Sequence, residues 1–337
     1  MPASPTGTPN KYVPAAFFGI VLGLVGLGSS WRMATLLWSV PAGIGEAVML
    51  TATAVWIVLI LLYAAKWIWA RAEALAEFRH PVQCCFVGVV PISTALIGIA
   101  LRPYALHLAE ALAAVGIVGQ LIFGLYRTGQ LWMGGRDPTT TTPMLYLPTV
   151  AGSFVSVITL SAFGHPDWAA PFFGVGVLSW LAIESVLVHR LYTVSELPPP
   201  LRPTLGIQLA PPTVGCSAYL SITSGAPDLF AQALLGYGLF QALLLIRLIP
   251  WIVRQPFAPS YWAFTFGLSA LAISFLRFVE RGASGPIPLA APYVFSAVNL
   301  AIGGIAAGTL WLLLRGRLLP PPLQPPPESL HPTPRVI

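Results

Sequence analysis

Residues 44–70 read IGEAVMLTATAVWIVLILLYAAKWIWA, an apolar run with one acidic residue near its start and one lysine near its end. A helix needs about 20 predominantly apolar residues to cross the hydrocarbon core of a bilayer. This run therefore predicts a transmembrane helix. Nine further runs of similar length and composition lie at residues 14–33, 82–101, 104–132, 145–163, 168–191, 204–223, 228–253, 260–280 and 287–314.

The composition of the whole chain agrees with a membrane protein. Of its 337 residues, 56% are hydrophobic and only 8% are charged, whereas an average soluble domain carries about 25% charged residues. So little charge cannot cover a water-facing surface. A transmembrane β-barrel would alternate apolar and polar residues in segments of about ten, and the continuous apolar runs exclude it. The predicted fold class is all-α integral membrane, with ten transmembrane helices.

The breaks between the runs predict the topology. They are short and carry proline, glycine or charge, so consecutive helices are expected to be antiparallel neighbours that form five helical hairpins. An even number of spans places both termini on one side. Because Lys and Arg are enriched in cytoplasmic loops, the distribution of the chain's 17 basic residues predicts that both termini are cytoplasmic, in a bacterial inner (plasma) membrane. Thirteen basic residues lie on the side of the termini, and the other side carries Arg32, Arg102, Arg277 and Arg281.

A single ten-helix domain is expected to span residues 12–318. Residues 1–11 form a polar N-terminal segment without the features of a cleavable signal peptide. Residues 319–337 are rich in proline and are predicted to form a disordered cytoplasmic tail.

The odd-numbered runs carry helix breakers near their first half: Pro14, Pro91, Pro148, Pro211–Pro212 and Gly267. Breakers leave backbone groups that only protein or water can satisfy inside a membrane, and small residues let helix backbones approach closely. We therefore predict that the odd-numbered helices surround a central pore and the even-numbered helices face lipid. The alternative is that the prolines are ordinary packing kinks. The candidate pore-lining residues are Gly19, Gly23, Pro91, Pro148, Gly152, Gln208, Pro211 and Gly267.

The residues that could carry chemistry are few. Cys84, Cys85 and Cys216 lie inside apolar runs without the spacing of a metal site, so neither a metal nor a cofactor is predicted. The basic residues lie singly or in pairs between the runs, not in the aromatic-interleaved patches that bind nucleic acid. No catalytic motif occurs, and an enzyme is not predicted.

Glu184 is the one acidic residue clearly inside an apolar run. An intramembrane acid is a candidate for function, but we interpret Glu184 as a structural partner for a nearby arginine or helix end. Uncharged polar residues inside the runs are expected to hydrogen-bond between helices. They are Gln120, Gln208, Gln241 and Asn299.

A path lined by small and apolar side chains favours passive permeation, and a positive cytoplasmic rim attracts anions. A coupled carrier normally needs titratable groups at mid-membrane. A proton-coupled dicarboxylate carrier, the main alternative, would require Glu184 or a histidine to titrate. An intramembrane enzyme would need a paired nucleophile and base or a metal cluster, which the sequence does not supply. A structural or partner-binding subunit is a further alternative, against which the glycine-rich odd helices argue.

Several strings in the sequence resemble the tellurite-resistance/dicarboxylate transporter family, which includes bacterial tellurite-resistance proteins, fungal malate permeases and the slow anion channels of plant guard cells. The resemblance covers about residues 10–318 and nearly every run. The strings are FGIVLG at 18–23, HPV at 80–82, LYLPTVA at 145–151, GIQLAP at 206–211, GYGLFQ at 236–241, RLIPW at 247–251 and WAFTFG at 262–267.

The resemblance implies a homotrimer in which each protomer holds a pore for small anions, with tellurite and dicarboxylates as possible substrates. Five odd helices would line that pore and five even helices would surround it. The family's Phe-Gly motif on the ninth helix matches Phe266–Gly267, so the resemblance implies that Phe266 plugs the pore as its gate. The sequence departs from the bacterial pattern at Ser185, where relatives carry proline, and at Gly152–Ser153, where they carry bulkier polar residues.

Overall fold

The computed structural model describes residues 12–319, which form helices joined by turns and contain no strand. The predicted N-terminal segment 1–11 and nearly all of the predicted tail 319–337 lie outside these residues. The run at 44–70, from which the fold was predicted, forms one α-helix, α2 (Ala42–Trp69). The all-α class is therefore confirmed for the described chain.

Within residues 12–319, nine helical stretches are long and apolar enough to cross a membrane. They coincide with nine of the ten predicted runs. The tenth run, 204–223, is also helical, but its prolines and polar residues lower its apolar character. It forms a 3₁₀ helix, η5 (Pro199–Leu209), continued by α9 (Ala210–Ile222).

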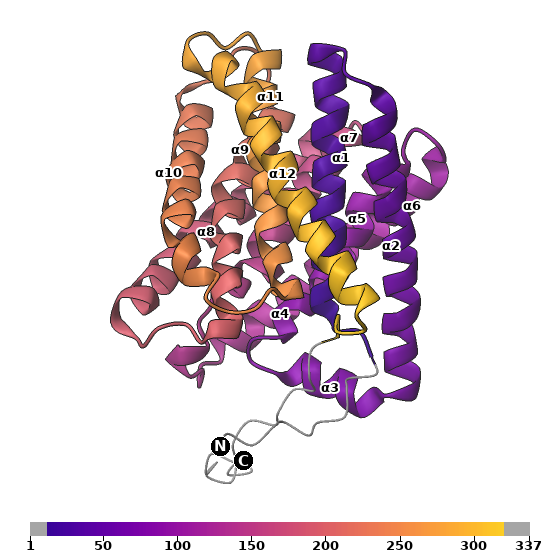
Figure 1. Ribbon diagram of the computed structural model, residues 1–337, viewed down its shortest axis with the longest axis vertical. Helices are drawn as coiled ribbons and strands as arrows, with labels where there is room; N and C mark the ends of the chain where they lie inside the picture. Colours follow the sequence, from indigo (N-terminus) through magenta and orange to yellow (C-terminus); the bar gives the residue numbers. More distant parts are fainter. Residues whose placement is uncertain (1–11, 320–337) are drawn as a thin grey trace.

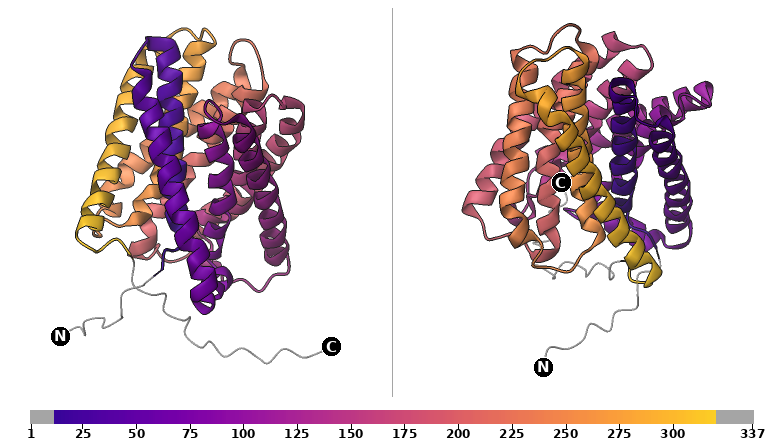
Figure 2. Two further views of the ribbon diagram at one scale, coloured as in Figure 1. Left: turned by 90° about the vertical axis from the view of Figure 1, so that its right-hand side faces the viewer. Right: turned by 45° about the horizontal axis from the view of Figure 1, so that its top comes forward.

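The helices form two layers. The outer layer consists of five long α-helices: α2, α6 (Leu106–Trp132), α8 (Pro166–Thr193), α10 (Leu229–Ile252) and α12 (Pro286–Leu314). Each packs against the inner helix that precedes it in the chain. The views in Figures 1 and 2 show the long helices standing side by side, with the short helix α3 (Arg71–Arg79) across one end.

The inner layer consists of five segments that each start with a short or irregular helical turn. Neighbouring segments contact one another in a closed ring, in the order α1, α5, α7, α9, α11 and back to α1. The segments are η1 (Ala15–Phe17) with α1 (Phe18–Trp38); α4 (Cys84–Val87) with α5 (Val89–Leu101); η3 (Pro143–Leu145) and the π-helical turn η4 (Leu147–Ala151) with α7 (Gly152–Ala162); η5 with α9; and η6 (Pro259–Phe264) with α11 (Thr265–Glu280).

Burial separates the two layers. We compare the buried share of the most apolar part of each stretch that is apolar enough to span a membrane. It is 50–72% for the inner stretches and 17–33% for the outer ones. The outer helices nevertheless expose large apolar side chains, such as Leu178 and Leu300. Contiguous apolar surface of this extent is unfavourable in water. The outer layer therefore has the surface of a protein that faces lipid.

Glycine allows the two layers to approach closely. A Cβ atom added to Gly116 on α6 would lie 2.4 Å from the backbone nitrogen of Ala95 on α5. No real side chain fits at that distance, so the α5–α6 contact requires glycine at this position. Small-residue contacts of this kind replace the hydrophobic effect as the source of packing energy between membrane helices.

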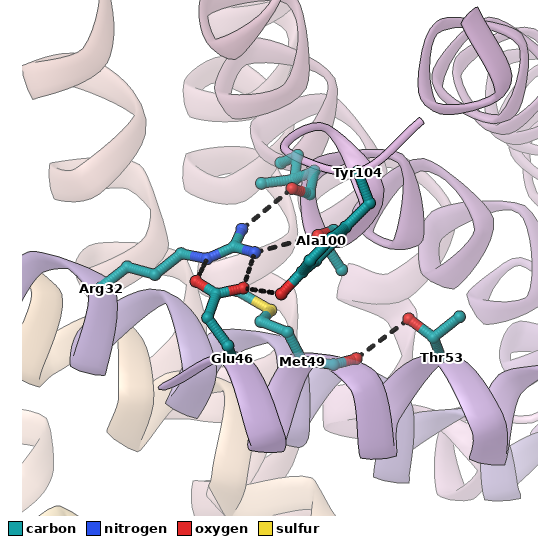
Figure 3. A network of polar contacts seen from close by, with 7 residues as sticks. Arg32, Glu46, Met49, Thr53, Ala100 and Tyr104 are labelled. Carbon is teal, nitrogen blue, oxygen red and sulfur yellow. Dashed lines mark hydrogen bonds and ion pairs between the residues drawn. The ribbon is translucent and has the colours of Figure 1, made fainter. Parts of the chain in front are cut away.

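An ion pair joins three helices at the end of the bundle opposite α3, which we call the far end. Arg32 on α1 contacts the Glu46 carboxylate on α2 at 2.7 Å and donates hydrogen bonds to the carbonyls of Ile99 and Ala100 on α5. Tyr104 also donates a hydrogen bond to the Glu46 carboxylate. Figure 3 shows the Arg32 guanidinium between Glu46 and Ala100, and the Tyr104 hydroxyl on the Glu46 carboxylate. The cluster satisfies the last carbonyls of α5, which have no partners within their own helix.

Candidate functional site

A cavity of about 490 Å³ lies inside the ring of inner segments. Its walls come from all five segments, and they lie mainly on the first, irregular turns of those segments. Irregular backbone at membrane depth is tolerated where it is buried in protein or lines a cavity. Of the breakers seen in the sequence, Pro14 and Pro211 line this cavity. We call the end of the bundle that carries α3 the α3 end; the cavity lies in that half.

Toward the middle of the bundle the cavity ends on apolar side chains. On each of the five inner segments, the last lining residue along the chain is apolar. We call these five residues the apolar ring: Leu22, Val89, Phe154, Val214 and Phe266.

Phe266 lies in the first turn of α11 and is partly buried. Its neighbour across the α1–α11 contact is Gly26, where an added Cβ would lie 3.6 Å from the Phe266 Cδ2 atom. Phe264, two residues earlier, does not line the cavity; a Cβ on Gly206 would lie 2.5 Å from its Cγ atom. The two phenylalanines therefore have different surroundings: Phe266 borders open space, and Phe264 packs onto η5.

The predicted pore-lining residues divide into two groups. Gly19 and Pro211 line the cavity together with Phe266. The others do not line it. Gly23, Gly152 and Gly267 lie instead at close contacts, where an added Cβ would come within 2.9 Å of Thr265, Gln120 and Leu209 respectively. Pro91 and the Pro148 carbonyl face Gly119 and Gly124 of α6.

Of the four uncharged polar residues expected to hydrogen-bond between helices, Gln120, Asn299 and Gln208 do so, whereas Gln241 bonds within α10. Gln120 on α6 donates to the Ser156 hydroxyl on α7 at 2.9 Å. Asn299 on α12 accepts from the Trp31 indole at 2.7 Å. Gln208 is buried on η5, and its Oε1 atom accepts from the Tyr146 hydroxyl at 2.9 Å.

Glu184 on α8 accepts three hydrogen bonds. Their donors are the hydroxyl of Tyr146, the indole of Trp180 at 3.0 Å and the hydroxyl of Tyr237 at 3.1 Å. Gln241 completes the group by donating to the Tyr237 hydroxyl at 2.9 Å. Among residues 12–319 no basic side chain forms an ion pair with Glu184, so its partners are aromatic donors and not the nearby arginine or helix end that we expected.

The only charged residues in the cavity wall of the described chain are Lys66 and Glu77. Lys66 is in the last turn of α2, and Glu77 is on α3; their Nζ and Oε2 atoms are 2.7 Å apart. The sequence reasoning missed this pair, because residues 71–81 counted only as a break between runs. The one signal was Lys66 itself, a lysine inside an otherwise apolar stretch.

His80, between α3 and α4, adds no charge beside the cavity. Its Nδ1 atom accepts hydrogen bonds from the amides of Val82 and Gln83, both at 3.1 Å. Burial holds the pKa of His80 below its ordinary value, which favours the neutral imidazole that such acceptance requires. His80 therefore acts as a cap for the turn that leads into α4.

Comparison with known proteins places these features in context. Residues 12–310 match the SLAC1 family, described as voltage-dependent anion channels. The chain is 38% identical over 306 residues to the tellurite resistance protein TehA homolog of Haemophilus influenzae, covering 90% of this chain and 92% of that protein. It is 24% identical to the guard cell S-type anion channel SLAC1 of Arabidopsis thaliana, over 79% of this chain and half of that longer protein.

Proposed function

The chain belongs to the SLAC1 family of voltage-dependent anion channels, and from this membership we propose that it conducts small anions passively across a bacterial inner membrane. The cavity inside the inner layer supports the proposal. Its wall is mostly apolar, and the only charged residues that the described part of the chain contributes to it, Lys66 and Glu77, neutralise each other. A coupled carrier normally places unpaired titratable or ion-binding groups on the transport path.

The proposed architecture is ten transmembrane helices in five hairpins, with the pore along the axis of the inner ring. The contacts of η5 and α9 support a tenth span, because α9 packs against α7, α8, α10 and α11 and so has its polar residues covered by protein. The α3 end is proposed to be cytoplasmic. The described chain begins and ends there (Figure 2), and the excess of basic residues on the side of the termini supports that orientation.

The proposed gate is Phe266. The single observation that carries this assignment is that the cavity ends on the apolar ring, of which Phe266 is a member. A narrow constriction lined by apolar side chains excludes hydrated ions by dewetting. Phe266 is the member that the family resemblance also singles out.

The substrate and the assembly follow from the resemblance. A relative is called a tellurite resistance protein, and we propose tellurite or dicarboxylates among the anions that cross. The homotrimer expected from the family is consistent with the large apolar side chains on the outer helices, which would face either lipid or a neighbouring protomer.

Current recordings from purified protein in planar bilayers test the function. Phe266→Ala should raise the anion current at least about tenfold over the wild-type protein, which corresponds to lowering the barrier by about 1.4 kcal/mol. A correctly folded Phe266→Ala protein that carries no anion current would overturn the proposal.

The second candidate function is a proton-coupled dicarboxylate carrier. It is favoured by one observation: Tyr146 lines the cavity and donates to Glu184, so a half-buried carboxylate lies one hydrogen bond from the proposed path.

A further inference from the structure

The Lys66–Glu77 ion pair is almost completely buried. Lys66 is 3% exposed and Glu77 1% exposed, and both belong to the cavity wall. The second carboxylate oxygen of Glu77 accepts a hydrogen bond from the Ala15 amide at 2.8 Å, where the first inner segment begins. Glu77 therefore holds together the start of η1, the end of α2 and the helix α3.

Stability alone does not explain a buried ion pair at this place. The desolvation of two charges offsets most of their attraction, and well-packed apolar residues of similar size are often as stabilising. What the pair does supply is a positive and a negative charge at the α3 end of the cavity, separated by one contact. Since no other charged residue of the described chain lines the cavity, these two residues set the fixed charge that an anion meets there.

We propose that Lys66 is the anion-attracting group at the mouth of the pore and that Glu77 limits its strength by neutralising it, so that this pair determines anion selectivity. The inference rests on the proposed function. Loss of the Glu77 charge leaves an uncompensated ammonium, which raises the local anion concentration. Loss of the Lys66 charge leaves an uncompensated carboxylate, which lowers it. A purely structural pair would respond in the same direction to both changes.

The experiment tests whether the two single variants change the anion selectivity in opposite directions. Glu77→Gln, Lys66→Gln and the double variant are each made in the Phe266→Ala protein, and reversal potentials are measured in bilayers under a potassium chloride gradient. Coulomb's law at about 5 Å in a water-filled mouth gives a change of about fourfold in anion occupancy. Glu77→Gln should raise the chloride-to-potassium permeability ratio by about that factor, Lys66→Gln should lower it, and the double variant should return to the starting value.

Ionic strength and a matched variant provide the controls. The Debye length falls from about 10 Å at 0.1 M salt to about 3 Å at 1 M, so both shifts should shrink in concentrated salt. Glu46→Gln breaks an ion pair with the same 2.7 Å separation at the far end of α2, away from the cavity, and should leave the permeability ratio unchanged.

The outcomes separate the inference from the proposed function. If Phe266→Ala passes no anion current, the channel function itself fails. If it conducts but both single variants shift the permeability ratio in the same direction, or neither shifts it, the pair is structural and this inference is overturned. Where only one single variant folds, its permeability ratio is compared with that of the double variant, and a shift opposite to the predicted sign overturns the inference.

Discussion

The Tyr146 hydroxyl donates a hydrogen bond to the Glu184 carboxylate and thereby joins the cavity wall to the outer helix α8. Tyr146 is buried, whereas Tyr237, another donor to the same carboxylate, is exposed on the outer surface. Glu184 thus bridges the inner and outer layers. Its three donors satisfy the carboxylate, and no side chain among residues 12–319 adds a basic partner.

Replacing Glu184 with Gln should leave transport nearly unchanged. The amide oxygen of Gln can still accept from Tyr146 and Trp180, so the bridge should persist at a cost of about 1–2 kcal/mol in the free energy of unfolding. We expect the anion permeability ratio and its pH dependence in Phe266→Ala/Glu184→Gln channels to match those of Phe266→Ala. The measurement is current–voltage recording at several pH values, with a thermal unfolding curve for each protein.

Tyr146→Phe is the control, because it removes the hydrogen bond from the cavity wall to Glu184 and keeps the carboxylate. Loss of a proton-driven component of transport in Glu184→Gln, with that component retained in Tyr146→Phe, would favour the carrier over the channel.

The contact between α5 and α6 should tolerate no side chain at position 116. Gly116→Ala places a Cβ 2.4 Å from the Ala95 backbone nitrogen, and relief of such overpacking costs about 1–3 kcal/mol. Gly129→Ala, on the same helix, meets nothing within 4 Å and should stabilise by up to about 1 kcal/mol through helix propensity. Thermal unfolding in detergent should move in opposite directions for the two proteins; equal shifts would show that the α5–α6 contact is looser than described.

Single cysteines should report the orientation of the bundle. Glu73 on α3 and Pro103 at the far end are both exposed, and the native cysteines are buried. Glu73→Cys should be protected from a membrane-impermeant maleimide added outside spheroplasts, and Pro103→Cys should react with it. Lysis should make both reactive. The reverse pattern would invert the topology that the basic residues predict.

The helices were predictable because long apolar runs end at recognisable breaks. Residues 44–70 were predicted and α2 covers Ala42–Trp69; the run at 228–253 forms α10 (Leu229–Ile252). The run at 204–223 was the hardest helix to predict. Its first part adopts 3₁₀ turns, and its composition alone does not distinguish a buried membrane helix from a loop.

The cavity was less predictable because a glycine in a helix indicates a close contact but does not identify the residue or cavity on the other side. Gly19 borders the cavity and Gly23, one turn later, touches Thr265, although the sequence treats them alike. Partners far apart in the chain were also invisible. Tyr146 and Tyr237 lie 38 and 53 residues from Glu184, and only the packing of the folded bundle brings them to one carboxylate.

Truncating Phe264 and truncating Phe266 should have different effects on stability and on the anion current. Phe264 packs against Gly206 and belongs to a cluster with Leu205 and Leu209, so Phe264→Ala should cost about 3 kcal/mol, at the low end for a buried phenylalanine because this ring is partly exposed. It should not increase the anion current.

Phe266 borders open space on its cavity side. Its removal enlarges a cavity that already exists, so Phe266→Ala should lose less stability than Phe264→Ala while conducting strongly. Paired unfolding curves and bilayer currents for the two proteins check this contrast. If Phe266→Ala is the less stable of the two and carries no current, Phe266 is a packing residue of the bundle. Truncating a packing residue lowers the free energy of unfolding, whereas truncating a gate raises the current.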